Sequence, residues 1–177
     1  MNRRDAATLI EQGVGGRGGV WADLGAGSGT FTRALIDVLG QGITVYAMDR
    51  ELAAVAALRE LARASHARIV AVQDDFTTDA ALADLPELLD GILLANALHF
   101  VRDAGAVLAR WTRRLRRGGR VVLVEYDRRG ANRWVPYPIP ISNLPVLARE
   151  AGLASFTVTA TRPSRYQGTM YAAFATL

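Results

Sequence analysis

The sequence predicts an α/β fold with a mostly parallel sheet, and three observations support this prediction. Short runs rich in β-branched and apolar residues alternate with longer segments of helical periodicity. A turn with three alternate glycines joins the first apolar run to the first long helical segment. The last two runs alternate apolar and polar residues and have no helical segment between them. We therefore expect parallel strands joined by crossover helices, followed by an antiparallel C-terminal hairpin.

The individual elements follow from these patterns in chain order. Strands are expected at residues 20–24, 43–48, 68–73, 89–95, 120–126, 155–161 and 169–176. Helices are expected at residues 29–39, 51–64, 104–116 and 142–151. Residues 162–168 then form the hairpin loop, and the prolines within residues 134–145 predict an extended segment. Together these elements predict a Rossmann-like three-layer sandwich with a seven-stranded, mostly parallel sheet.

The length of the chain fits a single domain. A chain of 177 residues, half of them hydrophobic, supplies enough apolar side chains for one core. No internal repeat and no long linker divides it. We expect residues 1–177 to form one domain, in which residues 1–18 are a flexible or helical lead and the glycine-rich residues 13–19 connect it to the first strand.

Composition excludes several kinds of chemistry. The chain has no cysteine, which rules out disulfides, thiolate metal sites and a cysteine nucleophile. With only two histidines, His66 and His99, a histidine metal site is not expected either. The basic residues 1–4 are followed by an apolar stretch too short for a signal peptide, and no run approaches the roughly 20 apolar residues of a membrane span. We expect a cytoplasmic protein without membrane contact.

The positive charge is concentrated in one segment. All 21 basic residues are arginine, the formal net charge is +4, and six of the arginines lie within residues 110–120. Such a run can neutralise nucleic-acid phosphates. It can equally be the solvated end of a helix, where cations complement the helix dipole and Gly118 and Gly119 close the helix. We favour the solvated helix end, and a nucleic-acid partner is the less favoured alternative.

A glycine-rich turn is the most informative motif. The strand at residues 20–24 runs directly into Gly25, Gly27 and Gly29 before a helix begins. Glycines at such a turn let the backbone approach a ligand at the carboxyl end of the sheet. A dinucleotide fingerprint would place its third glycine at position 30, where this chain has Thr30. We expect a nucleotide-like ligand, and a nicotinamide-dependent oxidoreductase is a disfavoured alternative.

Carboxylates follow the next two strands. Asp49 ends the second strand, 24 residues after Gly25, where its carboxylate can accept hydrogen bonds from both hydroxyls of a ribose. Asp75 and Phe76 follow the third strand and can hold an adenine. Asp75 alone would fit a helix cap or an Asx turn equally well.

In this order, the motifs resemble those of class I S-adenosylmethionine-dependent methyltransferases, from Trp21 to about Thr176. Residues 90–100 are similar to the family's strand-four motif, and residues 115–125 to the motif that follows it. The resemblance implies seven strands with the last antiparallel, and S-adenosylmethionine as cofactor. It also implies a set of cofactor contacts: Asp23, Gly25, Gly27, Gly29, Asp49 for the ribose, Asp75 and Phe76 for the adenine, and Asn96 for the methionine part.

The resemblance implies few obligatory catalytic residues. The cofactor already carries an activated methyl group, so the protein mainly aligns a nucleophile and excludes water. Asn96 is similar to a position beside the methyl-transfer region, or it is an amide that caps the strand end. His99 is the candidate general base, because histidine ordinarily titrates near neutral pH. The alternative is that His99 and Phe100 are packing residues.

The acceptor is predicted from the loops. Asn96 is followed by Ala97 and lacks the proline-proline-aromatic continuation of amino-group methylating enzymes, which makes nucleobase or glutamine N-methylation less expected. Residues 134–141 are the predicted lid, or a rigid crossover. Trp134, Tyr137 and Tyr126 are the predicted acceptor contacts. We expect a small-molecule acceptor; a noncatalytic S-adenosylmethionine-binding module and an RNA or protein methyltransferase are the alternatives.

Overall fold

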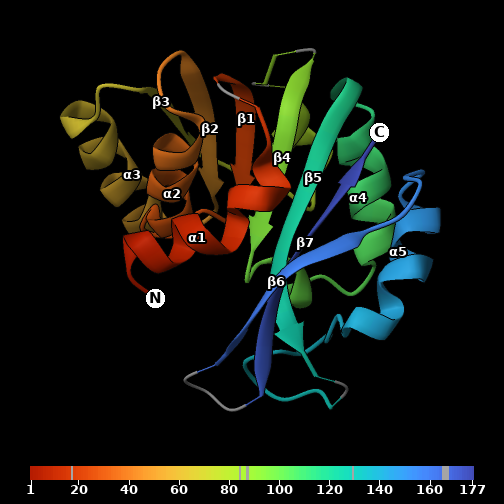
Figure 1. Ribbon diagram of the computed structural model, residues 1–177. Helices are drawn as coiled ribbons and strands as arrows, with labels where there is room; N and C mark the ends of the chain where they lie inside the picture. Colours follow the sequence, from red (N-terminus) through yellow and green to blue (C-terminus); the bar gives the residue numbers. More distant parts are fainter. Residues whose placement is uncertain (17, 84, 87, 129, 165–167) are drawn as a thin grey trace.

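A seven-stranded sheet forms the middle layer of the protein (Figure 1). The computed structural model describes residues 1–177 except 17, 84, 87, 129 and 165–167. The strands are β1 (Gly19–Leu24), β2 (Ile43–Asp49), β3 (Arg68–Gln73), β4 (Leu89–Ala95), β5 (Leu115–Asp127), β6 (Thr157–Pro163) and β7 (Thr169–Thr176). The α-helices are α1 (Arg3–Val14), α2 (Thr30–Leu39), α3 (Leu52–Ala64), α4 (Ala104–Thr112) and α5 (Leu144–Glu150). Three 3₁₀ turns are η1 (Ala80–Leu82), η2 (Leu98–Phe100) and η3 (Ile141–Asn143).

The strands are ordered β3-β2-β1-β4-β5-β7-β6 across the sheet. The first five in this order pair in parallel, whereas β7 runs antiparallel to both β5 and β6. The predicted Rossmann-like sheet with an antiparallel C-terminal hairpin is therefore confirmed. The predicted loop between the last two strands lies partly outside the described residues.

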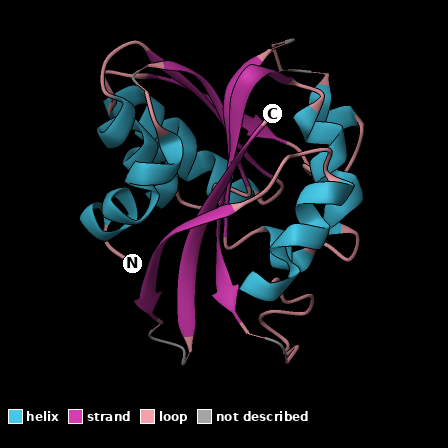
Figure 2. Cartoon of the chain, turned by 45° about the vertical axis from the view of Figure 1, so that its right-hand side comes forward, coloured by secondary structure: helices cyan, strands magenta, loops and turns pink. Residues whose placement is uncertain are grey.

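Helices cover both faces of the sheet and bury two separate apolar clusters (Figure 2). On one face, Leu9 and Ile10 of α1 and Leu35 of α2 pack with Leu58 of α3. On the other face, the cluster includes the fully buried Trp111 of α4. Burying each such side chain contributes roughly 1.5–3 kcal/mol. The two clusters hold the strands, and so the loops at the strand ends, in fixed positions.

Most of the N-terminal residues form a helix. The Asn2 side chain caps α1 by accepting a hydrogen bond of 2.8 Å from the backbone N–H of Asp5. Such a cap stabilises a helix by about 1 kcal/mol. Gly13 lies on the buried face of α1, close to Val122 and Phe174. The predicted lead is thus the first helix of one face of the sheet.

The boundary between α4 and β5 differs from the prediction. The helix expected to reach residue 116 ends at Thr112, and β5 begins at Leu115. Leu115 pairs with Leu89, after which β5 bulges and resumes pairing at Arg120. The prediction of a helix end closed by Gly118 and Gly119 is wrong, because the backbone of both glycines hydrogen-bonds to Leu177 at the end of the chain instead.

Several arginines of the basic segment have protein partners. Arg110 pairs with Asp79 at 2.9 Å and Arg116 pairs with Asp90. Arg120 donates to the backbone oxygen of Gly13 at 2.8 Å. These contacts anchor the segment to the fold, which weakens its interpretation as a phosphate-binding surface. Within the described residues, no helix has the length and apolar character needed to cross a membrane.

Candidate functional site

The carboxyl ends of the five parallel strands meet at one edge of the sheet. The chain crosses from β1 to β2 on one side, and β4 lies on the other side of β1. The order of strands therefore reverses between β1 and β4, and in open α/β sheets ligands bind at such a switch point. The loops that follow β1, β2, β3 and β4 all contribute to a cavity there.

This cavity, which we call the first cavity, has a volume of about 320 Å³. Small-molecule sites usually measure roughly 300–1,000 Å³. The residues that line it come from the ends of these strands and the loops beyond them. They are Gly25, Asp49, Arg50, Glu51, Asp74, Asp75, Phe76, Thr77, Asn96, Ala97, Phe100 and Val101.

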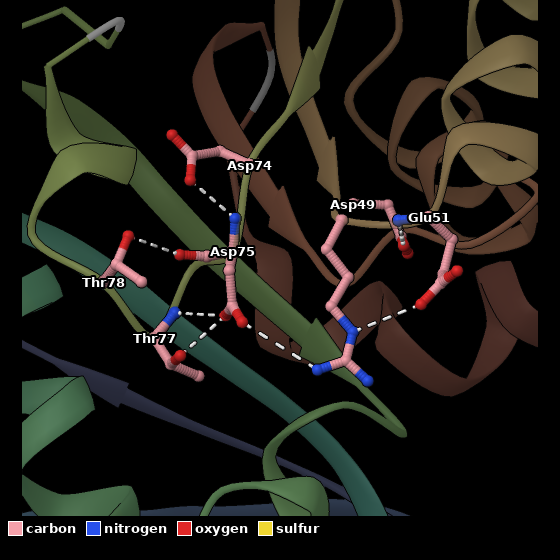
Figure 3. Close-up of polar contacts among 7 residues, drawn as sticks. Asp49, Glu51, Asp74, Asp75, Thr77 and Thr78 are labelled. Carbon is pink, nitrogen blue, oxygen red and sulfur yellow. Dashed lines mark hydrogen bonds and ion pairs between the residues drawn. The ribbon is translucent and has the colours of Figure 1, made fainter.

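Asp49 is held at the end of β2 by two backbone groups. Its Oδ2 accepts a 2.8 Å hydrogen bond from the N–H of Gly27. Its Oδ1 accepts one of 3.0 Å from the N–H of Glu51 (Figure 3). A carboxylate offers about four lone-pair sites. Each oxygen of Asp49 therefore keeps capacity for a further donor, as two ribose hydroxyls would require.

Asp75 organises the loop after β3. Its Oδ1 accepts hydrogen bonds from the Thr77 backbone N–H at 2.9 Å and from the Thr77 hydroxyl at 2.7 Å (Figure 3). Burial by itself would raise the pKa of Asp75, but these bonds and the charges of Arg50 and Arg110 lower it below its ordinary value overall. Asp75 thus forms a local turn and also lines the cavity.

The first cavity is acidic. Four carboxylates line it, and Arg50 is the one basic residue among the described lining residues. Arg50 lies between Glu51, with Nε 3.4 Å from Oε1, and Asp75, with Nη1 3.9 Å from Oδ2. Such a lining favours a ligand with positive charge. It opposes the pyrophosphate of a dinucleotide, which agrees with the incomplete glycine fingerprint.

The glycine turn brings the backbone to the cavity wall. Gly25 has φ +74°, and a Cβ placed on it would lie 2.7 Å from the Cβ of Ala97. A side chain at position 25 would therefore disturb both the turn and the neighbouring loop. Gly27 supplies the amide that holds Asp49, and Gly29 caps α2 in the left-handed conformation.

Asp23 differs from the other predicted cofactor residues, because it is not among the residues that line the first cavity. It is 1% exposed, and its Oδ2 accepts a 2.6 Å hydrogen bond from the Thr32 hydroxyl. Burial raises the pKa of its carboxyl to about 7, against the lowering effect of the Thr32 bond. The nearby charge of Asp49 contributes to this raised pKa. Asp23 couples β1 to α2 beneath the glycine turn.

Asn96 stands between two cavities. It is the one described non-glycine residue with positive φ, at 54°, and its buried Oδ1 has no hydrogen-bond partner among the described residues. It lines the first cavity and also a second cavity of about 240 Å³. The second cavity is formed by α1, the end of β5 and the β6–β7 hairpin, through Met1, Asp5, Asn96, Tyr126, Arg162, Pro163, Ser164 and Met170.

His99 forms a buried pair with Glu125. Its Nδ1 lies 2.6 Å from Glu125 Oε2, and the backbone N–H groups of Leu98 and His99 donate to Glu125 Oε1. His99 is 2% exposed and Glu125 is fully buried. The pair ties the loop after β4 to β5, and His99 is not among the described residues that line either cavity.

The predicted acceptor residues lie in different places. Tyr126 lines the second cavity. Trp134 is 65% exposed and Tyr137 donates its backbone N–H to His99, and neither is among the described residues lining the two cavities. The predicted lid is anchored: the hydroxyl of Tyr171 donates to the Ile139 oxygen at 2.7 Å. No group of His, Cys, Asp and Glu in the described part of the chain is arranged to hold a metal ion.

A family model described as a methyltransferase domain matches residues 22–121, which is more than half of the 177 residues. The chain belongs to this methyltransferase domain family. The matched segment runs from β1 into β5, and so contains the glycine turn, Asp49, Asp75 and Asn96. The predicted resemblance to S-adenosylmethionine-dependent methyltransferases is confirmed, and S-adenosylmethionine is the cofactor of the domain.

Solved methyltransferases share the whole fold of this methyltransferase domain. The 1,6-didemethyltoxoflavin-N1-methyltransferase of Burkholderia thailandensis, with 1,6-didemethyltoxoflavin and S-adenosylhomocysteine bound, is 27% identical. The alignment covers 98% of this chain and 77% of that one, with a TM-score of 0.71. A SAM dependent methyltransferase from Aquifex aeolicus has a TM-score of 0.71 over 99% of this chain and 98% of its own, at 15% identity.

A curated relative shares part of the sequence. Ribosomal RNA small subunit methyltransferase H of Bradyrhizobium diazoefficiens is 33% identical over 79 residues. These residues are 44% of this chain and 23% of that protein. The methyltransferase domain therefore spans about a quarter of the length of this relative.

The residues of the first cavity fit S-adenosylmethionine. Asp49 can receive the ribose hydroxyls, Phe76 offers an apolar ring beside Asp75, and the acidic lining suits a sulfonium. Sequence reasoning missed Arg50, Glu51 and Thr77, although each lies within two residues of a predicted acid. Their place directly after strand ends was the signal that could have found them.

Proposed function

We propose that this methyltransferase domain transfers the methyl group of S-adenosylmethionine to a small-molecule acceptor by in-line displacement. The observation that carries the proposal is the acidic first cavity, which adjoins a smaller second cavity at Asn96. When bound, S-adenosylmethionine would supply a methyl group on a positively charged sulfur. The acceptor's lone pair would form a bond to the methyl carbon while the carbon–sulfur bond breaks and its electrons neutralise the sulfur. The chain itself binds the cofactor, orients the acceptor toward the methyl group and excludes water from the site.

The residues predicted to contact the cofactor have distinct proposed parts in holding it. Asp49 binds the ribose, while Asp75 and Phe76 position the adenine. The backbone at Gly25 and Gly27 passes close to the ligand, and Asn96 lies at the methionine end. Asp23 acts indirectly, by fixing the glycine turn through Thr32.

A small-molecule acceptor is supported by the enzyme of Burkholderia thailandensis, which binds 1,6-didemethyltoxoflavin and is aligned over nearly the whole of this chain. The second cavity is also small, at about 240 Å³. The RNA alternative has its own support in the identity to the ribosomal RNA methyltransferase. RNA carries many phosphates, which basic side chains would have to bind. Three arginines of the basic segment already have partners within the protein.

Two measurements test the proposal. Calorimetric titration with S-adenosylhomocysteine should show one binding site per chain, and a titration with NAD should show none. Incubation with radiolabelled S-adenosylmethionine should then move the label to a component of a small-metabolite pool rather than to ribosomal RNA or protein. Cofactor binding without transfer to any acceptor would favour a noncatalytic binding module. Label found in ribosomal RNA would show that the acceptor is RNA and not a small molecule.

A further inference from the structure

We propose that the second cavity binds the methyl acceptor, and that this acceptor is a small uncharged molecule that presents an N–H or O–H group to Asn96. The inference rests on the proposed function. It assigns the acceptor to the space between α1 and the β6–β7 hairpin, and not to the predicted lid at residues 134–141.

The position of the second cavity fits direct transfer. A displacement needs the nucleophile about 3–3.5 Å from the carbon that it attacks, so the acceptor must lie against the cofactor. Asn96 lines both cavities, so the two cavities adjoin at this residue. Trp134 and Tyr137 are not among the described lining residues of these two cavities, so neither residue adjoins the cofactor site in the way that Asn96 does.

The size of the second cavity favours a free small molecule. Its volume of about 240 Å³ is smaller than that of the first cavity. Sites for drug-sized ligands begin at roughly 300 Å³. An acceptor that fills this space is smaller than such a ligand, and Met170 and Pro163 give it apolar walls.

The two charged side chains of the second cavity pair with each other. Asp5 and Arg162 are the charged side chains among its described lining residues, and Arg162 Nη2 lies 3.2 Å from Asp5 Oδ2. The two residues are 157 positions apart, so this pair also joins α1 to the hairpin. An anion would have to compete with Asp5 for Arg162, and a cation would have to compete with Arg162 for Asp5. An uncharged acceptor leaves the pair intact.

The unpaired oxygen of Asn96 selects a hydrogen-bond donor. Oδ1 is buried, and it has no hydrogen-bond partner among the described residues. An amide oxygen only accepts hydrogen bonds, so a ligand satisfies it by presenting an N–H or O–H group. Buried hydrogen-bond acceptors in proteins are almost always paired. We therefore assign the missing partner of this oxygen to a donor group of the bound acceptor molecule.

The three methionines provide probes for the test. Met1 and Met170 line the second cavity, whereas Met48 is fully buried in the core. The protein is labelled with ¹³C at the methionine methyl groups, saturated with S-adenosylhomocysteine, and titrated with three neutral or anionic probes of similar size. Benzamide is neutral and has an N–H donor, N,N-dimethylbenzamide is neutral without a donor, and benzoate is an anion.

We expect benzamide to shift the Met170 signal and leave Met48 unchanged, with affinity about fivefold or more above that of the other two probes. Asn96→Gly keeps a backbone that accepts positive φ and removes the oxygen, so it should abolish the preference for benzamide over N,N-dimethylbenzamide. Tyr46→Phe removes a hydroxyl from β2, outside both sets of lining residues, and should preserve the preference.

Several results would overturn the assignment. One is a Met170 signal that none of the probes moves while S-adenosylhomocysteine still binds. Another is tighter binding of benzoate, or a Met170 shift with a short single-stranded RNA and not with benzamide. A third is an Asn96→Gly variant that loses about tenfold in S-adenosylhomocysteine affinity yet still prefers benzamide, since the oxygen would then serve the cofactor. Failure of the parent protein to bind S-adenosylhomocysteine would refute the proposed function instead.

Discussion

Replacing Asp23 with Asn should flatten the dependence of stability on pH. Burial holds the pKa of this carboxyl at about 7 in the folded protein, against the ordinary value of 3.8 expected in the unfolded chain. Between these two values the folded state binds one proton more than the unfolded state. The contribution of Asp23 to the free energy of unfolding is therefore fully present below pH 3.8 and is lost as the pH rises toward 7.

The magnitude follows from the linkage relation. A difference of one bound proton changes the free energy of unfolding by about 1.4 kcal/mol per pH unit. From pH 5 to pH 7 the difference falls from nearly one proton to about half a proton, so Asp23 should lower the free energy of unfolding by about 2 kcal/mol. Asn cannot ionise, and its amide oxygen can still accept the bond from Thr32.

Urea unfolding at pH 5, 6, 7 and 8 measures this effect as the free energy of unfolding of the parent minus that of Asp23→Asn. Asp79→Asn is the control, because it removes a carboxylate whose side chain is 88% exposed and whose contribution solvent screens. The difference curve for position 23 should fall by about 2 kcal/mol between pH 5 and pH 7. Parallel curves for the parent and Asp23→Asn would refute the burial argument.

Four further changes test other parts of the structure. Gly25→Ala should weaken S-adenosylhomocysteine binding at least about tenfold in calorimetry, because its Cβ meets Ala97; unchanged affinity would remove the close-approach argument. Asp49→Ala should weaken the same binding about 10- to 100-fold through the lost hydrogen bonds to a charged acceptor, and a variant that binds normally would place the ribose elsewhere. Tyr171→Phe should lower the free energy of unfolding by about 1–2 kcal/mol, since the Ile139 oxygen loses its donor; a neutral result would mean that water replaces the hydroxyl. If His99 is the general base, His99→Gln should lower kcat about 100-fold with unchanged S-adenosylhomocysteine affinity, whereas a kcat within about threefold would leave His99 only its buried pairing with Glu125.

The sheet was predictable because its strands carry local patterns. Arg68–Gln73, Leu89–Ala95 and Thr169–Thr176 have the predicted bounds, since each is an apolar run that ends at polar or turn residues. The error lay between α4 and β5, where two glycines resemble a helix end. Pairing of Leu115 with Leu89, and of both glycines with Leu177, decided the conformation there. Such long-range pairing leaves no local pattern.

The candidate site was predictable to a similar degree. Parallel strands bring their carboxyl ends to one edge, so Asp49, Asp75 and Asn96 could be placed together from their positions after strands. The second cavity could not be predicted. It depends on contacts such as that between Asp5 and Arg162, which are 157 residues apart. The sequence instead suggested acceptor contacts within residues 134–141, because prolines and aromatic residues that are close together in the chain can be recognised without a structure.

Asn96 combines two features that folding alone does not favour. A non-glycine residue in the left-handed region costs on the order of 1 kcal/mol or more, and a buried acceptor without a partner costs about 1–3 kcal/mol. Glycine would avoid both at this position. If the side chain is retained for an acceptor molecule, Asn96→Gly should be at least as stable as the parent in urea unfolding while it loses the preference for benzamide. A variant clearly less stable than the parent would show that the Asn96 side chain serves the fold, and the strain at the junction of the two cavities would then need a structural explanation.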